Sequence, residues 1–317
     1  MHGVLIIDKP ADLTSHDVVA RVRQILHVRR VGHTGTLDPF ATGVLVVLVG
    51  NATRLAQFLS GAEKEYEAVI RLGFATDTGD ITGKPKSSIG DSTVQNVSHA
   101  WSDPEIEAAL TSLRGEIDQT PPMYSAKKQE GRKLYEMARR GEQIERQPVR
   151  INIHAFEAIR RGSLLLKNNA DGTFDLTAHV VCSAGTYVRA LAESFGERLG
   201  VGAHLAELRR IRAGSFQISE AISLEQLKGA ADEESLATVL LPPLAALRKL
   251  AHVDLNAPDV ERVRHGVAIP LAQHSSGAPI EGENVAMRDE AGNLVAVGIY
   301  YAASRTLQPR VVMAGDG

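Results

Sequence analysis

The chain has 317 residues, of which 44% are hydrophobic and 23% are charged, and its formal net charge is −3. This is ordinary globular composition that can bury a core without disulfides, and the single cysteine, Cys182, excludes an intramolecular disulfide. The apolar run near the N-terminus, Val4 to Ile7, is too short for a signal peptide, and no stretch approaches bilayer-spanning length. We therefore expect a cytoplasmic protein without membrane association.

The negative net charge gives no global signature of nucleic-acid binding, but the charges are distributed unevenly. Residues 21–30 hold four arginines and no acid, and residues 114–150 hold nine Lys or Arg against six Asp or Glu. A third cluster at residues 209–212 contains three arginines. Such clusters can follow phosphates along one face of a protein, although taken alone they are more typical of solvated helix faces. Composition permits RNA binding and does not establish it.

Hydrophobic spacing predicts alternating strands and helices along the first 246 residues. In chain order, the predicted elements are a strand at 3–7, a helix capped by Ser15 that runs to about Leu26, a strand at 44–49, a short helix capped by Asn51, and a half-buried strand at 64–73. There follow a long polar connection at 76–103, a helix at 104–113, an irregular stretch at 118–131, a helix at 133–140, strands at 149–160 and 174–182, and a helix at 187–199. Because regular βαβ spacing is missing, the pattern favours an α+β fold with a mixed sheet.

The pattern changes near Pro242 and Pro243. Beyond them the sequence has short alternating segments separated by turn residues, at 267–270, 284–288, 294–301 and 309–313. We expect a small C-terminal β-rich module at residues 247–317, after a larger domain at residues 1–246.

The most informative stretch is Gly32-His33-Thr34-Gly35-Thr36-Leu37-Asp38-Pro39-Phe40-Ala41-Thr42-Gly43. It is dense in glycine and hydroxyl groups, and it can present one carboxylate, that of Asp38, into a cleft just before a buried strand. It contains no phosphate-binding glycine-lysine motif, no histidine pair with metal-ligand spacing and no serine elbow. In isolation, an Asp-Pro pair is most often a turn.

This stretch and several others closely resemble motifs of the bacterial tRNA pseudouridine-55 synthases of the TruB type. The further matching motifs are Asp8-Lys9-Pro10 with Thr14-Ser15-His16-Asp17, Lys64-Glu65-Tyr66, Pro121-Pro122-Met123-Tyr124-Ser125-Ala126, Gly131-Arg132-Lys133-Leu134-Tyr135, Cys182 to Arg189, and Gly202 to Arg210. They cover most of residues 3–216 in family order, which makes chance agreement negligible.

The resemblance implies a mixed-sheet pseudouridine synthase domain, a C-terminal PUA-like RNA-binding module, and isomerisation of the uridine at position 55 in the T-loop of tRNA. It implies that Asp38 is the nucleophile, that Arg189 holds it charged, and that Tyr66 stacks on the flipped base and takes part in proton transfer. It also implies that His33, Tyr187 and Leu208 line the nucleotide pocket. Without the resemblance, Tyr66 and Leu208 read as core residues. No metal or other cofactor is expected, and Lys9 and Pro10 are expected to support the loop structurally.

Five residues are candidates for gripping the RNA backbone, although a solvated helix face is nearly as good a reading of each: Tyr124, Lys127, Lys128, Arg132 and Lys133. The expected partner is the T arm of tRNA, bound by a monomer that needs no protein partner. Three alternatives stay open. They are a non-catalytic tRNA-binding or tRNA-folding protein on the same scaffold, a hydrolase that uses Asp38 with His33, and a guide-RNA-dependent synthase.

Overall fold

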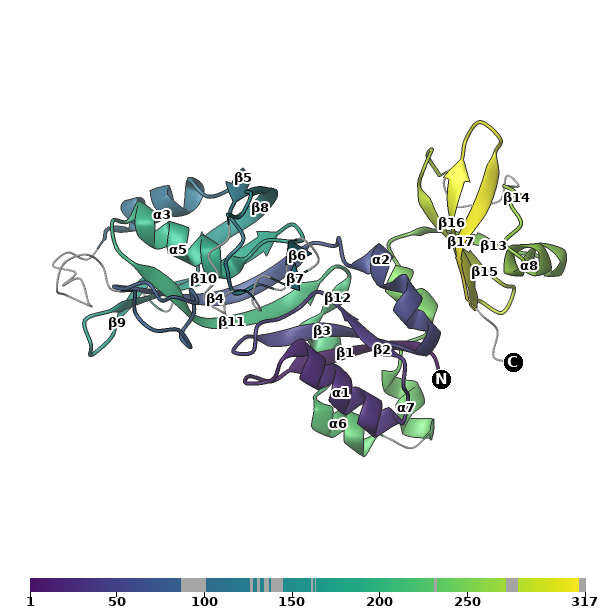
Figure 1. The fold of residues 1–317 in the computed structure, drawn as a ribbon, viewed down its shortest axis with the longest axis horizontal. Helices are drawn as coiled ribbons and strands as arrows, with labels where there is room; N and C mark the ends of the chain where they lie inside the picture. The colour runs from purple at the N-terminus through teal and green to yellow at the C-terminus, as the bar shows by residue number, and fades with distance from the viewer. Residues whose placement is uncertain are drawn as a thin grey trace.

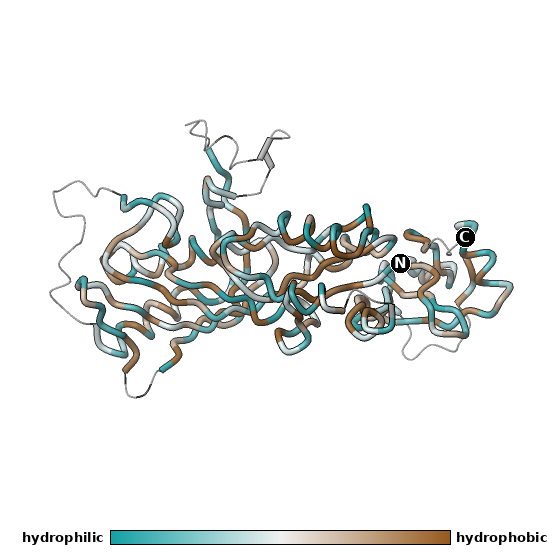
Figure 2. Tube along the Cα trace, turned by 90° about the horizontal axis from the view of Figure 1, so that it is seen from below, coloured by the Kyte–Doolittle hydropathy of each residue, from teal (hydrophilic) through white to brown (hydrophobic). Residues whose placement is uncertain are grey.

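The structure is a computed structural model that describes residues 1–86, 101–125, 128–129, 132–133, 137, 145–160, 162, 164–230, 233–271 and 279–313. The molecule is elongated, and a small β-rich module lies at one end of a larger α+β domain (Figure 1). Hydrophobic residues follow the central strands, whereas hydrophilic residues gather on the peripheral turns (Figure 2). The α+β class expected from the sequence is therefore confirmed.

One mixed sheet of ten strands forms the larger domain, and its main path runs in the order β1-β3-β11-β4-β10-β8-β5, with β2, β9 and β12 attached at the sides. The strands are β1 (Gly3–Lys9), β2 (Val31–Thr34), β3 (Thr42–Val49), β4 (Lys64–Leu72), β5 (Gly115–Gln119), β8 (Val149–Ala158), β9 (Leu166–Asn168), β10 (Phe174–Cys182), β11 (Ala203–Ala213) and β12 (Phe216–Gln217). A separate two-stranded hairpin consists of β6 (Lys128–Gln129) and β7 (Arg132–Lys133).

Helices cover different parts of this sheet. The helical segments are α1 (Ser15–Leu26), η1 (Gly50–Leu55), α2 (Ala56–Leu59), α3 (Asp103–Thr111), α5 (Val188–Arg198), η2 (Ile218–Glu220), α6 (Leu224–Gly229), α7 (Glu233–Val239) and η3 (Pro243–Leu247). Apolar residues of α3 and α5 pack on β4, β8 and β10, whereas those of α1, α6 and α7 pack on one face of β1 and β3. The apolar cluster that α3 and α5 form with these strands also includes Tyr66 and Leu208.

The two halves of the sheet meet at a short junction. There β3 pairs in parallel with β11 at two positions only, Thr42 with Arg209 and Gly43 with Arg210. The approach is close, because a Cβ atom on Gly43 would lie 2.2 Å from the carbonyl oxygen of Arg210, and the backbone of Gly43 has a φ of +100°. Only glycine fits this position without displacing a strand. We call this pairing the β3–β11 junction.

The predicted starts of two helices are wrong. Thr14, not Ser15, caps α1, and it forms a reciprocal capping box with Asp17. The segment expected to start at Asn51 is instead a 3-10 helix that begins at Gly50, followed by a single turn of α-helix. At α1 the sequence offers two adjacent hydroxyl residues, and Thr14 takes the cap position, whereas the segment at Gly50 follows Val49 and has no side-chain cap.

The C-terminal module is a five-stranded sheet in the order β13-β15-β16-β17-β14, accompanied by helix α8. Its elements are β13 (Ala251–Asp254), α8 (Ala257–Arg264), β14 (Ile269–Pro270), β15 (Asn284–Arg288), β16 (Leu294–Tyr301) and β17 (Thr306–Val312). Leu294, Val297 and Val311 of this module share one apolar cluster with Ala246 and Leu247 and with residues of β1 and β3. The boundary after residue 246 stays a prediction, because that cluster draws on both sides of it.

Most predicted strands are confirmed, including β4, β10, β15 and β16, but several elements were missed. Hydrophobic spacing did not predict β11, β13, α6, α7 or α8. The stretch expected to be irregular at 118–131 contains the end of β5 and all of β6. The helix expected at 133–140 falls mostly outside the described residues, and its first residue, Lys133, lies in β7. The connection expected at 76–103 is described up to residue 86 and from residue 101.

Candidate active site

Asp38 lies on the loop between β2 and β3, and three buried side chains hold that loop in place. Ser15 exchanges two hydrogen bonds with Leu37, accepting from its N–H at 2.9 Å and donating to its carbonyl oxygen at 3.2 Å. Lys9, which is fully buried, donates to the carbonyl oxygen of Pro39 at 3.0 Å. Arg210 donates to the carbonyl oxygen of Gly35 at 3.1 Å. The carboxylate is thus presented by a rigid loop, as the sequence predicted.

Arg189 forms an ion pair with Asp38. Its Nε lies 2.8 Å from Oδ2 of Asp38, and its second terminal nitrogen donates to Oδ1 at 3.2 Å. Arg189 is positioned at the first turn of α5 and also donates to the carbonyl oxygens of Thr78 and Tyr124, each at 2.7 Å. Its side chain is only 5% exposed, whereas that of Asp38 is 34% exposed. The Arg189 side chain is therefore held by its contacts, whereas the Asp38 carboxylate is exposed enough to reach a ligand.

A second carboxylate stands behind this pair. Oδ2 of Asp80 lies 3.7 Å from Arg189, and its Oδ1 accepts hydrogen bonds from Thr78 and Thr82. Burial raises the pKa of Asp38 above its ordinary value, the Arg189 guanidinium partly offsets this rise, and the Asp80 charge adds to it. Arg189 thus balances two acids in a water-poor site.

The Asp38–Arg189 pair opens into a cavity of about 260 Å³ with an aromatic and apolar wall. Tyr66 from β4 and Leu208 from β11 lie on this wall, together with Tyr187, which precedes α5. The side-chain amide of Gln119 in β5 holds the backbone of Tyr187, accepting from its N–H at 2.8 Å and donating to its carbonyl oxygen at 3.1 Å. Burial raises the pKa of Tyr66, so its hydroxyl is protonated at neutral pH. A planar ring that enters this cavity would contact both an aromatic face and the carboxylate.

A second cavity of about 580 Å³ is also lined by Asp38 and Arg189, together with His16, Phe40, Asp80 and Tyr124, among others. His33 lies on β2 and packs edge-on against His16, with ring centroids 5.5 Å apart. Burial is the main cause that lowers the pKa of His33 to about 4. His33 is therefore placed beside this second cavity, through His16, and is not among the residues lining the first.

Comparison with known proteins identifies the group to which this site belongs. The family model described as "TruB family pseudouridylate synthase (N terminal domain)" matches residues 23–188, and the model described as "tRNA pseudouridylate synthase B C-terminal domain" matches residues 189–248. The chain belongs to the TruB family. It is an enzyme of the isomerase class, a pseudouridylate synthase.

Relatives extend the TruB match over the whole chain. A tRNA pseudouridine synthase B of Geobacillus thermodenitrificans is 42% identical over 271 residues, which are 86% of this chain and 86% of the relative. One of Bacillus pumilus is 38% identical over 317 residues, covering 100% of this chain and 99% of the relative. A solved chain described as "Structure of H/ACA RNP bound to a substrate RNA containing 2'-deoxyuridine" has a TM-score of 0.72 at 27% identity, covering 99% of this chain and 85% of that chain.

The predicted RNA-backbone contacts of this TruB chain are only partly within the described structure. Tyr124 lies beside the second cavity, where its carbonyl oxygen accepts from Arg189. The backbone of Lys128 belongs to β6, that of Arg132 and Lys133 to β7, and Lys127 lies outside the described residues. Contact of these side chains with RNA stays a prediction.

Sequence reasoning missed three residues of this TruB site: Lys64, Asp80 and Arg210. A signal existed for Lys64, because it alternates with Tyr66 and so shares its face of β4. For Asp80 and Arg210 the neighbours come from distant parts of the chain, and only the fold brings them together. Lys9, in contrast, has the structural role expected of it.

The site presents one carboxylate, that of Asp38, to the first cavity beside the Arg189 guanidinium. Among the described residues, no group of three or more His, Cys, Asp or Glu side chains could hold a metal ion, and no helix is long and apolar enough to cross a membrane. A carboxylate that is paired with one guanidinium and partly open to a cavity can form a covalent bond to a ligand and later leave. Asp38, Arg189 and Tyr66 are together able to bind, attack and release one base.

Proposed function

We propose that this chain converts uridine to pseudouridine at position 55 in the T-loop of tRNA, without a cofactor, and that Asp38 is the nucleophile. The observation that carries the proposal is the Asp38–Arg189 ion pair at the mouth of an aromatic-walled cavity. The relatives named as tRNA pseudouridine synthases support tRNA as the substrate.

The residues suggest a sequence of steps. The target uridine leaves the RNA stack and enters the cavity, where its ring stacks on Tyr66 against Leu208. The Asp38 carboxylate forms a covalent bond to the nucleotide, with Arg189 keeping it ionised and aligned. The uracil detaches, turns and rejoins through C5, and the carboxylate is released. Tyr66 borders the turning ring, which makes it a candidate for proton transfer once the ring has rejoined.

The decisive experiment is mapping of pseudouridine in a T-arm RNA incubated with the purified full-length chain. The wild type should modify the uridine at position 55, and Asp38→Asn should lower the rate by about 10⁴-fold or more while RNA affinity stays nearly unchanged. Retained activity of Asp38→Asn would refute the assigned nucleophile. Absence of pseudouridine with the wild type, together with tight RNA binding, would instead favour a non-catalytic tRNA-binding protein.

We further propose that the chain acts as a monomer without a protein partner or guide RNA. Activity on a bare transcript in a purified system tests this point. If product appears only after another protein or a guide RNA is added, the chain is a partner-dependent synthase.

A further inference from the structure

Two buried cations lie side by side on the cavity wall that also carries Tyr66. In the pairing of β4 with β11, Arg210 lies directly across from Tyr66, and Lys64 precedes Tyr66 by two residues, on the same face of β4. Both cations line the same cavity as Asp38. Both also approach Gly35 in the loop that carries Asp38, because a Cβ atom on Gly35 would lie 3.7 Å from a terminal nitrogen of Arg210 and 3.7 Å from Cε of Lys64.

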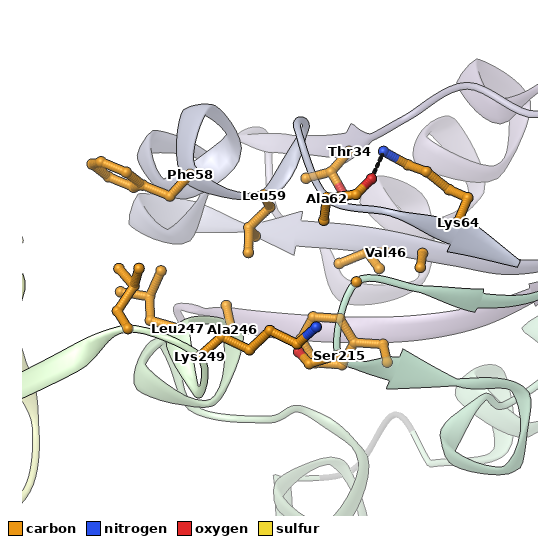
Figure 3. Close-up of a pocket in the computed structure, with 14 residues that line it drawn as sticks. Thr34, Val46, Phe58, Leu59, Ala62, Lys64, Ser215, Ala246, Leu247 and Lys249 are labelled. Atoms are coloured by element: carbon orange, nitrogen blue, oxygen red, sulfur yellow. Dashed lines mark hydrogen bonds between the residues drawn. The ribbon is translucent and has the colours of Figure 1, made fainter. Parts of the chain in front are cut away.

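Neither cation is neutralised by an acid within the described part of the chain. Lys64 donates to the carbonyl oxygens of Ser60, at 2.9 Å, and of Ala62 (Figure 3). Arg210 donates to the carbonyl oxygens of Gly35, at 3.1 Å, and of Val44, at 2.7 Å. Carbonyl dipoles hold these groups in place but leave their full positive charge uncompensated.

The charge of Asp38 does not balance them either, because Arg189 already pairs with that carboxylate. The cavity lining therefore contains the Asp38–Arg189 ion pair and, beside Tyr66, the two cations Lys64 and Arg210, which have no acid partner among the described residues. Figure 3 shows Lys64 also on the wall of a neighbouring, mostly apolar pocket that contains Phe58 and Leu247. Burying two uncompensated cations is costly, and such sites favour ligands on which negative charge develops.

We propose, resting on the function proposed above, that Lys64 and Arg210 stabilise the negative charge that the uracil ring acquires when it is detached from the ribose. In that step an oxygen of the Asp38 carboxylate bonds to C1′, and the C1′–N1 bond breaks with its electron pair going to N1. The unit charge of the carboxylate passes to the uracil, where it spreads over N1, O2 and O4. On reattachment C5 bonds to C1′, the ester bond returns its pair to Asp38, the C5 proton is lost and N1 gains a proton.

The charge state of Lys64 suits this role. Burial and the neighbouring Arg210 charge lower the pKa of Lys64 to about 8, so most of the molecules carry an ammonium group at neutral pH. An ammonium with a lowered pKa also donates a stronger hydrogen bond to an anion.

The test compares two RNA substrates that differ only in how well the base carries negative charge. T-arm RNAs with uridine or 5-fluorouridine at the target position are reacted with excess full-length enzyme, and the loss of the intact N1-linked nucleoside is followed by digestion and chromatography. Fluorine withdraws electrons and makes the uracil a better leaving group. Lys64→Met should lower the rate at which the uridine RNA loses its N1-linked nucleoside by roughly 100-fold, and the corresponding rate of the 5-fluorouridine RNA by a clearly smaller factor.

Three further variants make the result specific. Lys64→Arg and Arg210→Lys keep the charge and should retain more activity on uridine than Lys64→Met, with the same substrate dependence. Lys249→Met removes an exposed lysine from the neighbouring pocket in Figure 3 and should leave both rates unchanged. Equal losses on both substrates for Lys64→Met and Arg210→Lys would overturn this inference and leave the proposed function standing. A wild type that makes no pseudouridine from the uridine RNA would overturn the proposed function itself.

Discussion

At the scale of single residues, the site is governed by charge in a partly dry cavity. The proposed attack needs an ionised Asp38, yet burial and Asp80 both raise the pKa of Asp38, whereas Arg189 and Lys9 lower it. Activity that depends on the ionised Asp38 is therefore present above its raised pKa and is lost as the pH falls through it.

This balance predicts the effect of Asp80→Asn on the pH profile. Removing the Asp80 charge should move the acid limb of the single-turnover rate to lower pH, while the plateau also falls because Arg189 loses a partner. Asp77→Asn, at an exposed position in the same loop, should leave the limb where it is. A limb that does not move in Asp80→Asn would show that Asp80 exerts no electrostatic effect on Asp38.

The residues of this site differ in how readily the sequence alone identifies them. Asp38, Tyr66 and Arg189 stand in motifs that resemble a family, and Lys64 could have been read from strand alternation. The role of Arg210 could not, because its hydrogen-bond partners Gly35 and Val44 lie more than 160 residues away along the chain. Contacts of that separation are created by the topology of the sheet.

At the scale of elements, two adjacent residues at the start of α1 have different roles, one in helix stability and one in positioning the loop that carries Asp38. Thr14 caps the helix, whereas Ser15 connects the helix to Leu37 in the loop that carries Asp38. Thr14→Ala should cost about 1 kcal/mol of unfolding free energy and leave the turnover rate unchanged. Ser15→Ala leaves the buried N–H of Leu37 unpaired and should cost about 1–3 kcal/mol.

Ser15→Ala should also lower the turnover rate, because the loop that carries Asp38 loses its anchor. Urea unfolding and single-turnover kinetics of the two variants check this contrast. Equal effects of both substitutions on the rate would contradict a special role for the Ser15–Leu37 contact.

Two of the elements that the sequence did not reveal lack a regular hydrophobic pattern, each for its own reason. Strand β11 pairs with β4 through two register shifts, at 205–207 and 210–212, which break the alternation of inward and outward side chains. Its four charged residues further obscure the pattern, although Arg210 is buried. Helix α8 is only eight residues long, and its apolar face is correspondingly short. Regular strands such as β4 and β10 were predictable because their alternation is unbroken.

At the scale of the whole molecule, a net charge of −3 must coexist with binding to a polyanion. Binding then depends on where the basic residues are placed, and each phosphate contact releases counterions. We expect the affinity for T-arm RNA to fall steeply with salt. Neutralising Lys127 and Lys128 should reduce the slope of log affinity against log salt by up to about two. Fluorescence titrations at several salt concentrations measure this slope, and a flat response of the wild type would contradict phosphate contacts.

The β3–β11 junction has a consequence for how the enzyme can be inactivated. Asp38 is attached to the half of the sheet that contains β2 and β3, whereas Tyr66 and Leu208 are attached to the half that contains β4 and β11. Two residue pairs, one of them at Gly43, join the halves along β3 and β11. A single methyl group added at Gly43 would push β3 and β11 apart and so shift Asp38 relative to Tyr66 and Leu208. Inherited or engineered loss of activity can therefore arise where no reacting group has changed.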